Sequence, residues 1–147
     1  MDGPDERLPM ILVVDDEPFI VSLLAAALGQ HGFDVRTAAS GDQAVEVYLR
    51  GGFDLVLLDV RMPDPWDGPA TLAALQTADP MVRAAFMSGS TGGYTDEELL
   101  ALGSVRLFSK PFLCLAELAA TLRALIPTLA ARPSAGRALP ASCDASL

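Results

Sequence analysis

Three aspartates and one lysine each follow directly after a short apolar segment of the chain. The four residues are Asp15, Asp16, Asp59 and Lys110. Short apolar runs that alternate with helical patterns indicate buried strands of a parallel sheet. In an open α/β sheet, groups just past the carboxyl ends of the strands meet in one crevice, so we expect these side chains to converge. Three carboxylates at close range repel one another, and a divalent cation with a transferred phosphoryl group would make the arrangement favourable.

Five apolar segments with helical patterns between them would position these residues. The expected strands are residues 10–14, 33–38, 55–58, 82–87 and 105–109. The expected helices begin at Pro18, cover 41–49, lie around 69–77, begin at Thr95 and cover 115–126. Thr95 and Glu98 have the spacing of a capping box. Five strand–helix units in about 120 residues favour an α/β fold with a doubly wound, five-stranded parallel sheet of flavodoxin-like order 2-1-3-4-5.

Length and composition set limits on the organisation of the chain. The 147 residues, 51% of them hydrophobic, suffice for one ordinary domain. We expect that domain over residues 8–128 and a flexible tail rich in Ala, Pro and Ser over 129–147. The net charge of −9 argues against nucleic acid or an anionic membrane as a direct partner of this domain.

Sequence signals also bear on localisation. The two cysteines form no disulfide framework, and the acidic first residues lack the cationic start of a signal peptide. The apolar segment 112–131 is interrupted by two charged residues and Pro127, which argues against a membrane span. The expectation is therefore a soluble cytoplasmic protein.

The ordered set of short motifs resembles a response-regulator receiver domain. Each motif stands at the carboxyl end of an expected strand, and the interval of 22 residues from Ser88 to Lys110 agrees with the family pattern. The resemblance covers residues 8–128, and its motifs are Asp15-Asp16, Asp59 with Met62-Pro63, Ser88-Gly89 and Lys110-Pro111-Phe112.

The resemblance implies that Asp59 is the phosphoacceptor. Its carboxylate would attack the phosphorus of a phosphohistidine and become an acyl phosphate. Mg²⁺ would be held by Asp16 and Asp59, by Asp15 directly or through water, and by the backbone carbonyl of Arg61.

The resemblance also assigns roles around the phosphoryl group. Lys110 would pair first with the Asp59 carboxylate and then with phosphoryl oxygens, while the Ser88 hydroxyl would donate a hydrogen bond. Gly89 would leave the site open, and Pro111 would follow a cis peptide bond, which X–Pro pairs adopt at low cost.

The function implied is that of a single-domain response regulator in a Mg²⁺-dependent two-component phosphorelay. Its partners would be a sensor histidine kinase or histidine phosphotransfer protein, and a downstream protein reached by direct contact. The chain would be a phosphoprotein that assists its own phosphorylation and dephosphorylation, not an enzyme.

Three features depart from the family pattern, and one of them is Ser88 in place of an equally acceptable threonine. The stretch from Asp59 to Gly68 is one residue longer than usual. Leu107 stands three residues before Lys110, where the family usually has an aromatic switch residue, and the neighbouring Phe108 should point to the opposite face of its strand. We therefore expect the signal to leave through the segment 89–94 and the short helix after it. The alternative is that this segment is mobile in both states and that the partner contacts the surroundings of the acyl phosphate directly.

Other classes of protein explain only part of the pattern. A phosphatase of the haloacid-dehalogenase type also uses a nucleophilic aspartate, but it needs an acid two residues later, where Arg61 stands. A flavodoxin needs a Gly-rich phosphate loop after the first strand, whereas residues 15–17 are all acidic and would repel phosphate without a metal. A receiver-like scaffold without phosphorylation would be expected to lack a key residue, and none is missing.

Overall fold

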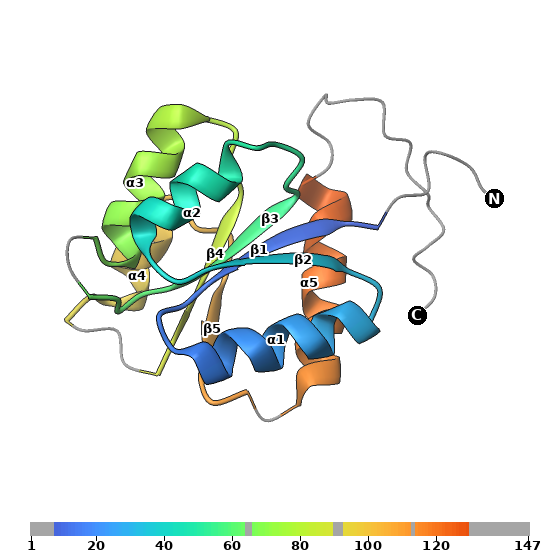
Figure 1. Ribbon diagram of the computed structural model, residues 1–147. Helices are drawn as coiled ribbons and strands as arrows, with labels where there is room; N and C mark the ends of the chain where they lie inside the picture. The colour runs from blue at the N-terminus through green and yellow to red at the C-terminus, as the bar shows by residue number, and fades with distance from the viewer. Residues whose placement is uncertain (1–7, 64–65, 90–92, 113, 130–147) are drawn as a thin grey trace.

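A five-stranded parallel sheet with helices on both faces forms the protein (Figure 1). The structure is a computed structural model, and it describes residues 8–63, 66–89, 93–112 and 114–129. The strand order is β2-β1-β3-β4-β5, and every neighbouring pair is parallel. The predicted fold class and strand order are confirmed.

Strands and helices alternate along the chain as the apolar pattern predicts. The strands are β1 (Met10–Val14), β2 (Asp34–Ala38), β3 (Leu55–Asp59), β4 (Ala84–Ser88) and β5 (Leu107–Ser109). The helices are α1 (Pro18–Gln30), α2 (Gly41–Tyr48), α3 (Gly68–Ala78), α4 (Asp96–Ala101) and α5 (Leu115–Leu129).

Some boundaries differ from the predicted ones by one to three residues. β5 begins at Leu107 rather than at 105, although the Val105 backbone N–H already donates to the Ala84 carbonyl oxygen (2.8 Å). α5 extends to Leu129, one residue into the segment expected as a tail. Few hydrogen bonds hold the ends of elements, so such shifts are common. The rest of the expected tail, 130–147, lies outside the described residues, and the division into domain and tail stays a prediction.

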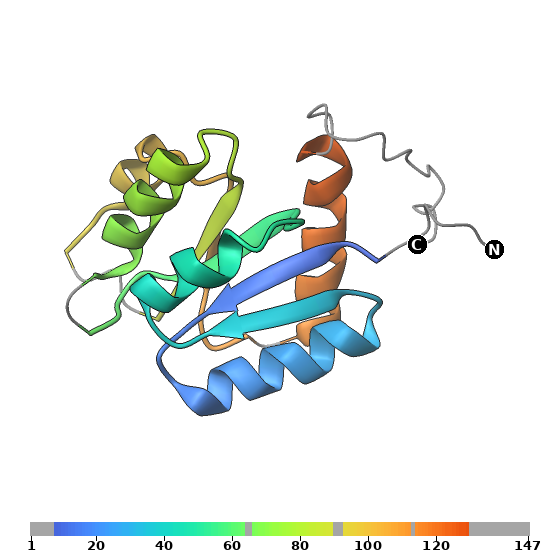
Figure 2. The ribbon, with the colours of Figure 1, turned by 45° about the horizontal axis from the view of Figure 1, so that its top comes forward.

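The helices divide between the two faces of the sheet (Figure 2). Side chains alternate along each central strand, so Leu12 and Leu58 face α2, α3 and α4, whereas Ile11 and Leu57 face α1 and α5. All five residues of β3 are buried. Strands covered on both faces need apolar side chains throughout, which explains the continuous hydrophobic runs in the sequence.

Polar residues start several helices at the carboxyl edge of the sheet. Ser40 caps α2 by accepting a hydrogen bond from the Gln43 backbone N–H (3.3 Å), and Asp67 caps α3. Thr95 and Glu98 form the predicted capping box of α4. These starts surround the edge at which the aspartates stand. Among the described helices, none combines the length and the apolarity that a membrane span needs.

Candidate functional site

Asp15, Asp16 and Asp59 meet at the carboxyl edge of the sheet, as predicted. One carboxylate oxygen of each lies within 4.8 Å of the other two. β1 and β3 are neighbours in the sheet, and Asp15 follows the last residue of β1 while Asp59 ends β3. The Asp15 and Asp59 residues are only 1% and 4% exposed, whereas Asp16 is exposed. The cluster therefore has a buried side and an open side.

Lys110 bridges two of these carboxylates. Its Nζ lies 3.0 Å from Asp15 Oδ2 and 3.3 Å from Asp59 Oδ1. The predicted pairing with Asp59 is confirmed, but the shorter contact is with Asp15. The Lys110 backbone N–H donates to the Ser88 carbonyl oxygen (3.0 Å), so the chain beyond β5 stays aligned with β4. The predicted cis peptide bond before Pro111 is also present.

Burial and neighbouring charges shift the pKa values of both Asp59 and Lys110. Burial of the Asp59 carboxyl, together with the negative charge of Asp15, raises its pKa from the usual 3.8 to about 6, although Lys110 opposes the rise. Burial alone would lower the pKa of Lys110, but its hydrogen bond to Asp15 and the charge of Asp59 raise it. Lys110 is therefore a firmly held cation, while ionised Asp59 is under electrostatic stress that a further cation would relieve.

The carboxylate cluster is chemically suited to a hard divalent cation. Mg²⁺ takes carboxylate, carbonyl and water oxygens as ligands and usually uses only one or two carboxylates from the protein. Asp16 and Asp59 supply such oxygens, and the burial and the negative charge of Asp15 that raise the pKa of Asp59 both favour a positive ion beside it. The donor set fits Mg²⁺.

The remaining predicted residues lie around this cluster. Ser88 ends β4, which lies beside β3, with Asp59 and Met87 as paired residues. Gly89 is exposed, and a Cβ placed there would lie 3.9 Å from Lys110 Cβ, an ordinary contact. Arg61 is exposed two residues after Asp59. The roles of the Ser88 hydroxyl and the Arg61 carbonyl stay predictions.

The sequence did not predict the close approach of Gly68 to the site. A Cβ at this position would lie 2.3 Å from the Asp59 carbonyl oxygen and 2.8 Å from Val60 Cα. The Gly68 backbone N–H donates to the Val60 carbonyl oxygen (2.8 Å). The start of α3 is therefore seated directly on the backbone at Asp59. A glycine directly after a capping aspartate was the available signal.

The two residues before Ser109 point to opposite faces, as predicted. Leu107 packs with the core cluster under α2, α3 and α4, while Phe108 packs with the cluster under α1 and α5. The side of β5 that faces α4 therefore carries a leucine at the position where the family pattern has an aromatic ring.

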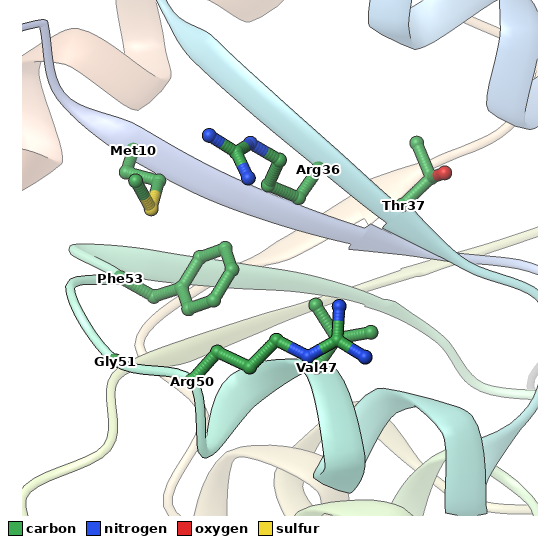
Figure 3. A pocket seen from close by; sticks show the side chains of 7 residues that line it. All are labelled: Met10, Arg36, Thr37, Val47, Arg50, Gly51 and Phe53. Carbon is green, nitrogen blue, oxygen red and sulfur yellow. The ribbon is translucent and has the colours of Figure 1, made fainter.

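A separate hollow lies between the edge strand β2 and the end of α2 (Figure 3). Its volume is about 380 Å³, and it is lined by Met10, Arg36, Thr37, Val47, Arg50, Gly51 and Phe53. The lining has no carboxylate, imidazole or thiol, and the Arg36 guanidinium already pairs with Asp34 (3.2 Å). The hollow therefore offers neither a metal site nor an acid–base pair, and the aspartate cluster remains the candidate site.

A model of the response regulator receiver domain matches residues 11–123. The chain belongs to this family. It is 39% identical over 101 residues to the transcriptional regulatory protein ZraR of Escherichia coli strain K12, covering 69% of this chain and 23% of ZraR. It is 33% identical over 116 residues to the transcriptional regulatory protein TrcR of Mycobacterium tuberculosis, covering 79% of this chain and 44% of TrcR. The receiver domain thus spans less than half the length of these curated relatives.

Solved structures share the fold. A CheY-like receiver domain protein of Methanospirillum hungatei aligns with a TM-score of 0.75 at 22% identity, over 84% of this chain and 98% of that one. The response regulator TrrA of Thermotoga maritima, solved in complex with Mg²⁺-BeF, aligns with a TM-score of 0.70 at 28% identity, over 80% of this chain and 99% of TrrA. The protein is a receiver domain of two-component signalling. Because ZraR and TrcR are transcriptional regulators, the expected absence of nucleic-acid partners finds no support in these comparisons.

Proposed function

We propose that Asp59 accepts a phosphoryl group from a histidine kinase or a histidine phosphotransfer protein in a Mg²⁺-dependent phosphorelay. The observation that carries the proposal is the ammonium of Lys110 held between Asp15 and Asp59 beside an open carboxylate, Asp16. Phosphoryl transfer proceeds through a loose transition state with charge on three equatorial oxygens, so catalysis is mainly positioning and charge neutralisation.

Hydrogen bonding favours Asp59 over Asp15 as the nucleophile. Asp15 uses one oxygen for the Glu17 backbone N–H (3.0 Å) and the other for Lys110 (3.0 Å). Asp59 uses Oδ1 for Lys110 (3.3 Å), and no described residue donates a hydrogen bond to its Oδ2. Asp59 Oδ2 therefore has a lone pair available to attack phosphorus, while Asp15 is held in place as the anchor of Lys110.

The proposed step transfers one phosphoryl group. The Asp59 oxygen–phosphorus bond forms as the phosphorus–nitrogen bond of the donor phosphohistidine breaks, and that electron pair returns to the imidazole ring. Lys110 neutralises phosphoryl oxygens, and the Ser88 hydroxyl donates a hydrogen bond to another. Mg²⁺ bound by Asp16, Asp59 and the Arg61 carbonyl would supply further neutralisation of charge, and the Mg²⁺-BeF complex of TrrA supports this part of the proposal. The chain acts as a phosphoacceptor that assists its own modification, not as an enzyme on a separate substrate.

We infer that the output is contact with a downstream protein. A second candidate output is control of transcription through a DNA-binding segment of a longer protein. One observation favours it: both ZraR and TrcR are transcriptional regulators, and the chain covers only 23% and 44% of them.

Intact-mass measurement after incubation with acetyl phosphate and Mg²⁺ tests the phosphoacceptor. The wild type should gain one phosphoryl adduct, and Asp59→Asn should gain none. Asp42→Asn, which alters an exposed aspartate in the first turn of α2, is the matched control and should behave as the wild type. An unmodified wild type, also with a panel of histidine kinases, would refute the proposal.

A further inference from the structure

One side-chain hydrogen bond joins the first turns of α3 and α4. The Tyr94 hydroxyl donates to Asp67 Oδ2 at 3.0 Å. Asp67 uses its other oxygen, Oδ1, to accept from the Ala70 backbone N–H (2.9 Å) and so caps α3. Tyr94 directly precedes Thr95, the residue that caps α4. A single contact thus links two helix starts that follow two different strands of the site.

The Asp67 end of this contact is tied closely to the proposed phosphoacceptor. Asp67 precedes Gly68, whose backbone leaves no room for a Cβ beside the Asp59 carbonyl oxygen (2.3 Å). The Gly68 N–H also donates to the Val60 carbonyl oxygen (2.8 Å). A displacement of the backbone at Asp59 should therefore also displace Asp67, because atoms in van der Waals contact move together.

The Tyr94 end of the contact is tied to α4 and to the core. The Tyr94 ring packs against the same core cluster as Leu107. The reciprocal hydrogen bonds of Thr95 and Glu98 (3.0 and 2.9 Å) hold the chain directly after Tyr94 onto the first turn of α4. Tyr94 also follows Ser88, the proposed donor to the phosphoryl group, by six residues. Its hydroxyl thus joins the start of α4 to the start of α3, the helix whose first residue lies against the backbone at Asp59.

We propose that Tyr94 is the positioning residue that couples the phosphoryl group on Asp59 to α4, through its hydrogen bond with Asp67. This inference rests on the proposed function. The side of β5 that faces α4 carries Leu107 in place of a ring, so an aromatic ring at that position cannot supply the coupling. A switch needs a contact whose free energy differs between its two states. The Tyr94–Asp67 bond joins the start of the helix that follows Asp59 to the start of the helix that follows Ser88, so a phosphoryl group that contacts Asp59 and Ser88 would act on both of its ends.

Hydrogen exchange of the full chain, with Mg²⁺ and with or without beryllofluoride, tests the coupling. In the wild type, beryllofluoride should change deuterium uptake both around Asp59 and in α4. Tyr94→Phe keeps the ring and removes the hydroxyl. It should keep the change around Asp59 but reduce the change in α4 to less than half of the wild-type value.

Two further variants separate coupling from simple stabilisation. Asp67→Ser retains a helix cap but is too short to reach Tyr94, and combining it with Tyr94→Phe should cause no further loss in α4. Tyr48→Phe is the matched control, because it removes another tyrosine–aspartate hydrogen bond (Tyr48 to Asp79, 2.6 Å) between α2 and the end of α3. It should lower the melting temperature as Tyr94→Phe does while leaving the α4 response intact.

The outcomes distinguish the two proposals. An α4 response of wild-type size in Tyr94→Phe, or an equal loss in Tyr48→Phe, overturns the role of Tyr94. A wild type that shows the change around Asp59 but none in α4 overturns it as well, while the proposed phosphoacceptor function stands. If beryllofluoride changes deuterium uptake nowhere in the wild type, both the proposed function and the coupling are overturned.

Discussion

Replacing Asp59 with asparagine should stabilise the metal-free protein at neutral pH. Asparagine resembles the protonated carboxyl in shape but carries no charge. The pKa of the Asp59 carboxyl in the folded protein is about 6, against the usual 3.8, and a tenfold change in an acid dissociation constant corresponds to about 1.4 kcal/mol. The ionised carboxylate therefore costs the native state about 3 kcal/mol, an order-of-magnitude value that already includes the opposing effect of Lys110. The residue is 4% exposed, so solvent screening leaves most of this cost in place.

The sign of the pH dependence follows from the raised pKa. Between pH 3.8 and about 6 the unfolded chain loses the Asp59 proton while the native state keeps it, so native stability falls as the pH rises. Above about pH 6 both states are ionised at Asp59 and the cost is constant. The advantage of Asp59→Asn should thus be absent below pH 4, grow up to about pH 6 and stay level above it.

Urea unfolding in EDTA, from pH 4 to pH 8, measures this difference. The matched control is Asp42→Asn, whose carboxyl is exposed and has its pKa lowered by the Ser40 side chain; it should show no such gain. With Mg²⁺ at about ten times its dissociation constant, the free energy of unfolding of the wild type should rise by about 1.4 kcal/mol. That of Asp59→Asn should not rise. The electrostatic account of the site would be refuted if the gain in stability of Asp59→Asn did not vary with pH. It would also be refuted if Asp59→Asn were less stable than the wild type at pH 8.

Three further predictions concern the surroundings of Asp59. Gly68→Ala should lower the free energy of unfolding in urea by about 1–3 kcal/mol, because the new Cβ would lie 2.3 Å from the Asp59 carbonyl oxygen. Gly89→Ala, whose new Cβ would lie 3.9 Å from the nearest atom, should lower it by less than about 0.5 kcal/mol. Equal losses in the two variants would contradict the close approach of Gly68. Asp16→Ala should abolish the rise in melting temperature caused by millimolar Mg²⁺, and an unchanged rise would place the metal elsewhere. Lys110→Ala leaves two buried carboxylates without their cation and should lower the free energy of unfolding by about 3 kcal/mol at pH 7. A loss below about 0.5 kcal/mol would show that the ion pairs contribute little to stability.

Local patterns in the sequence were enough to predict most of the architecture. The buried runs before Asp15 and Asp59 predicted adjacent parallel strands, because only strands covered on both faces need uninterrupted apolar residues. The capping box of Thr95 and Glu98 was also predicted, since a cap depends on residues three positions apart. The convergence of the carboxylates followed from the rule that parallel strands end at the same edge.

Properties that depend on distances between elements required the tertiary structure. The sequence predicted that Lys110 would reach Asp59, but the register of β5 and the packing beyond it decided that Asp15 receives the shorter contact. The pKa of Asp59 likewise depends on burial and on its separation from Asp15, which no spacing along the chain specifies.

The same reason explains why Gly68 and the Tyr94–Asp67 bond escaped prediction. The Gly68 contact depends on where α3 begins relative to the end of β3. The Tyr94–Asp67 bond forms because α3 and α4 begin at the same edge of the sheet. The order of short motifs along the chain determined which residues gather at that edge. The packing of helices onto the sheet determined which of their atoms touch, because a contact of 3 Å depends on how separate elements are placed in space and not on spacing along the chain.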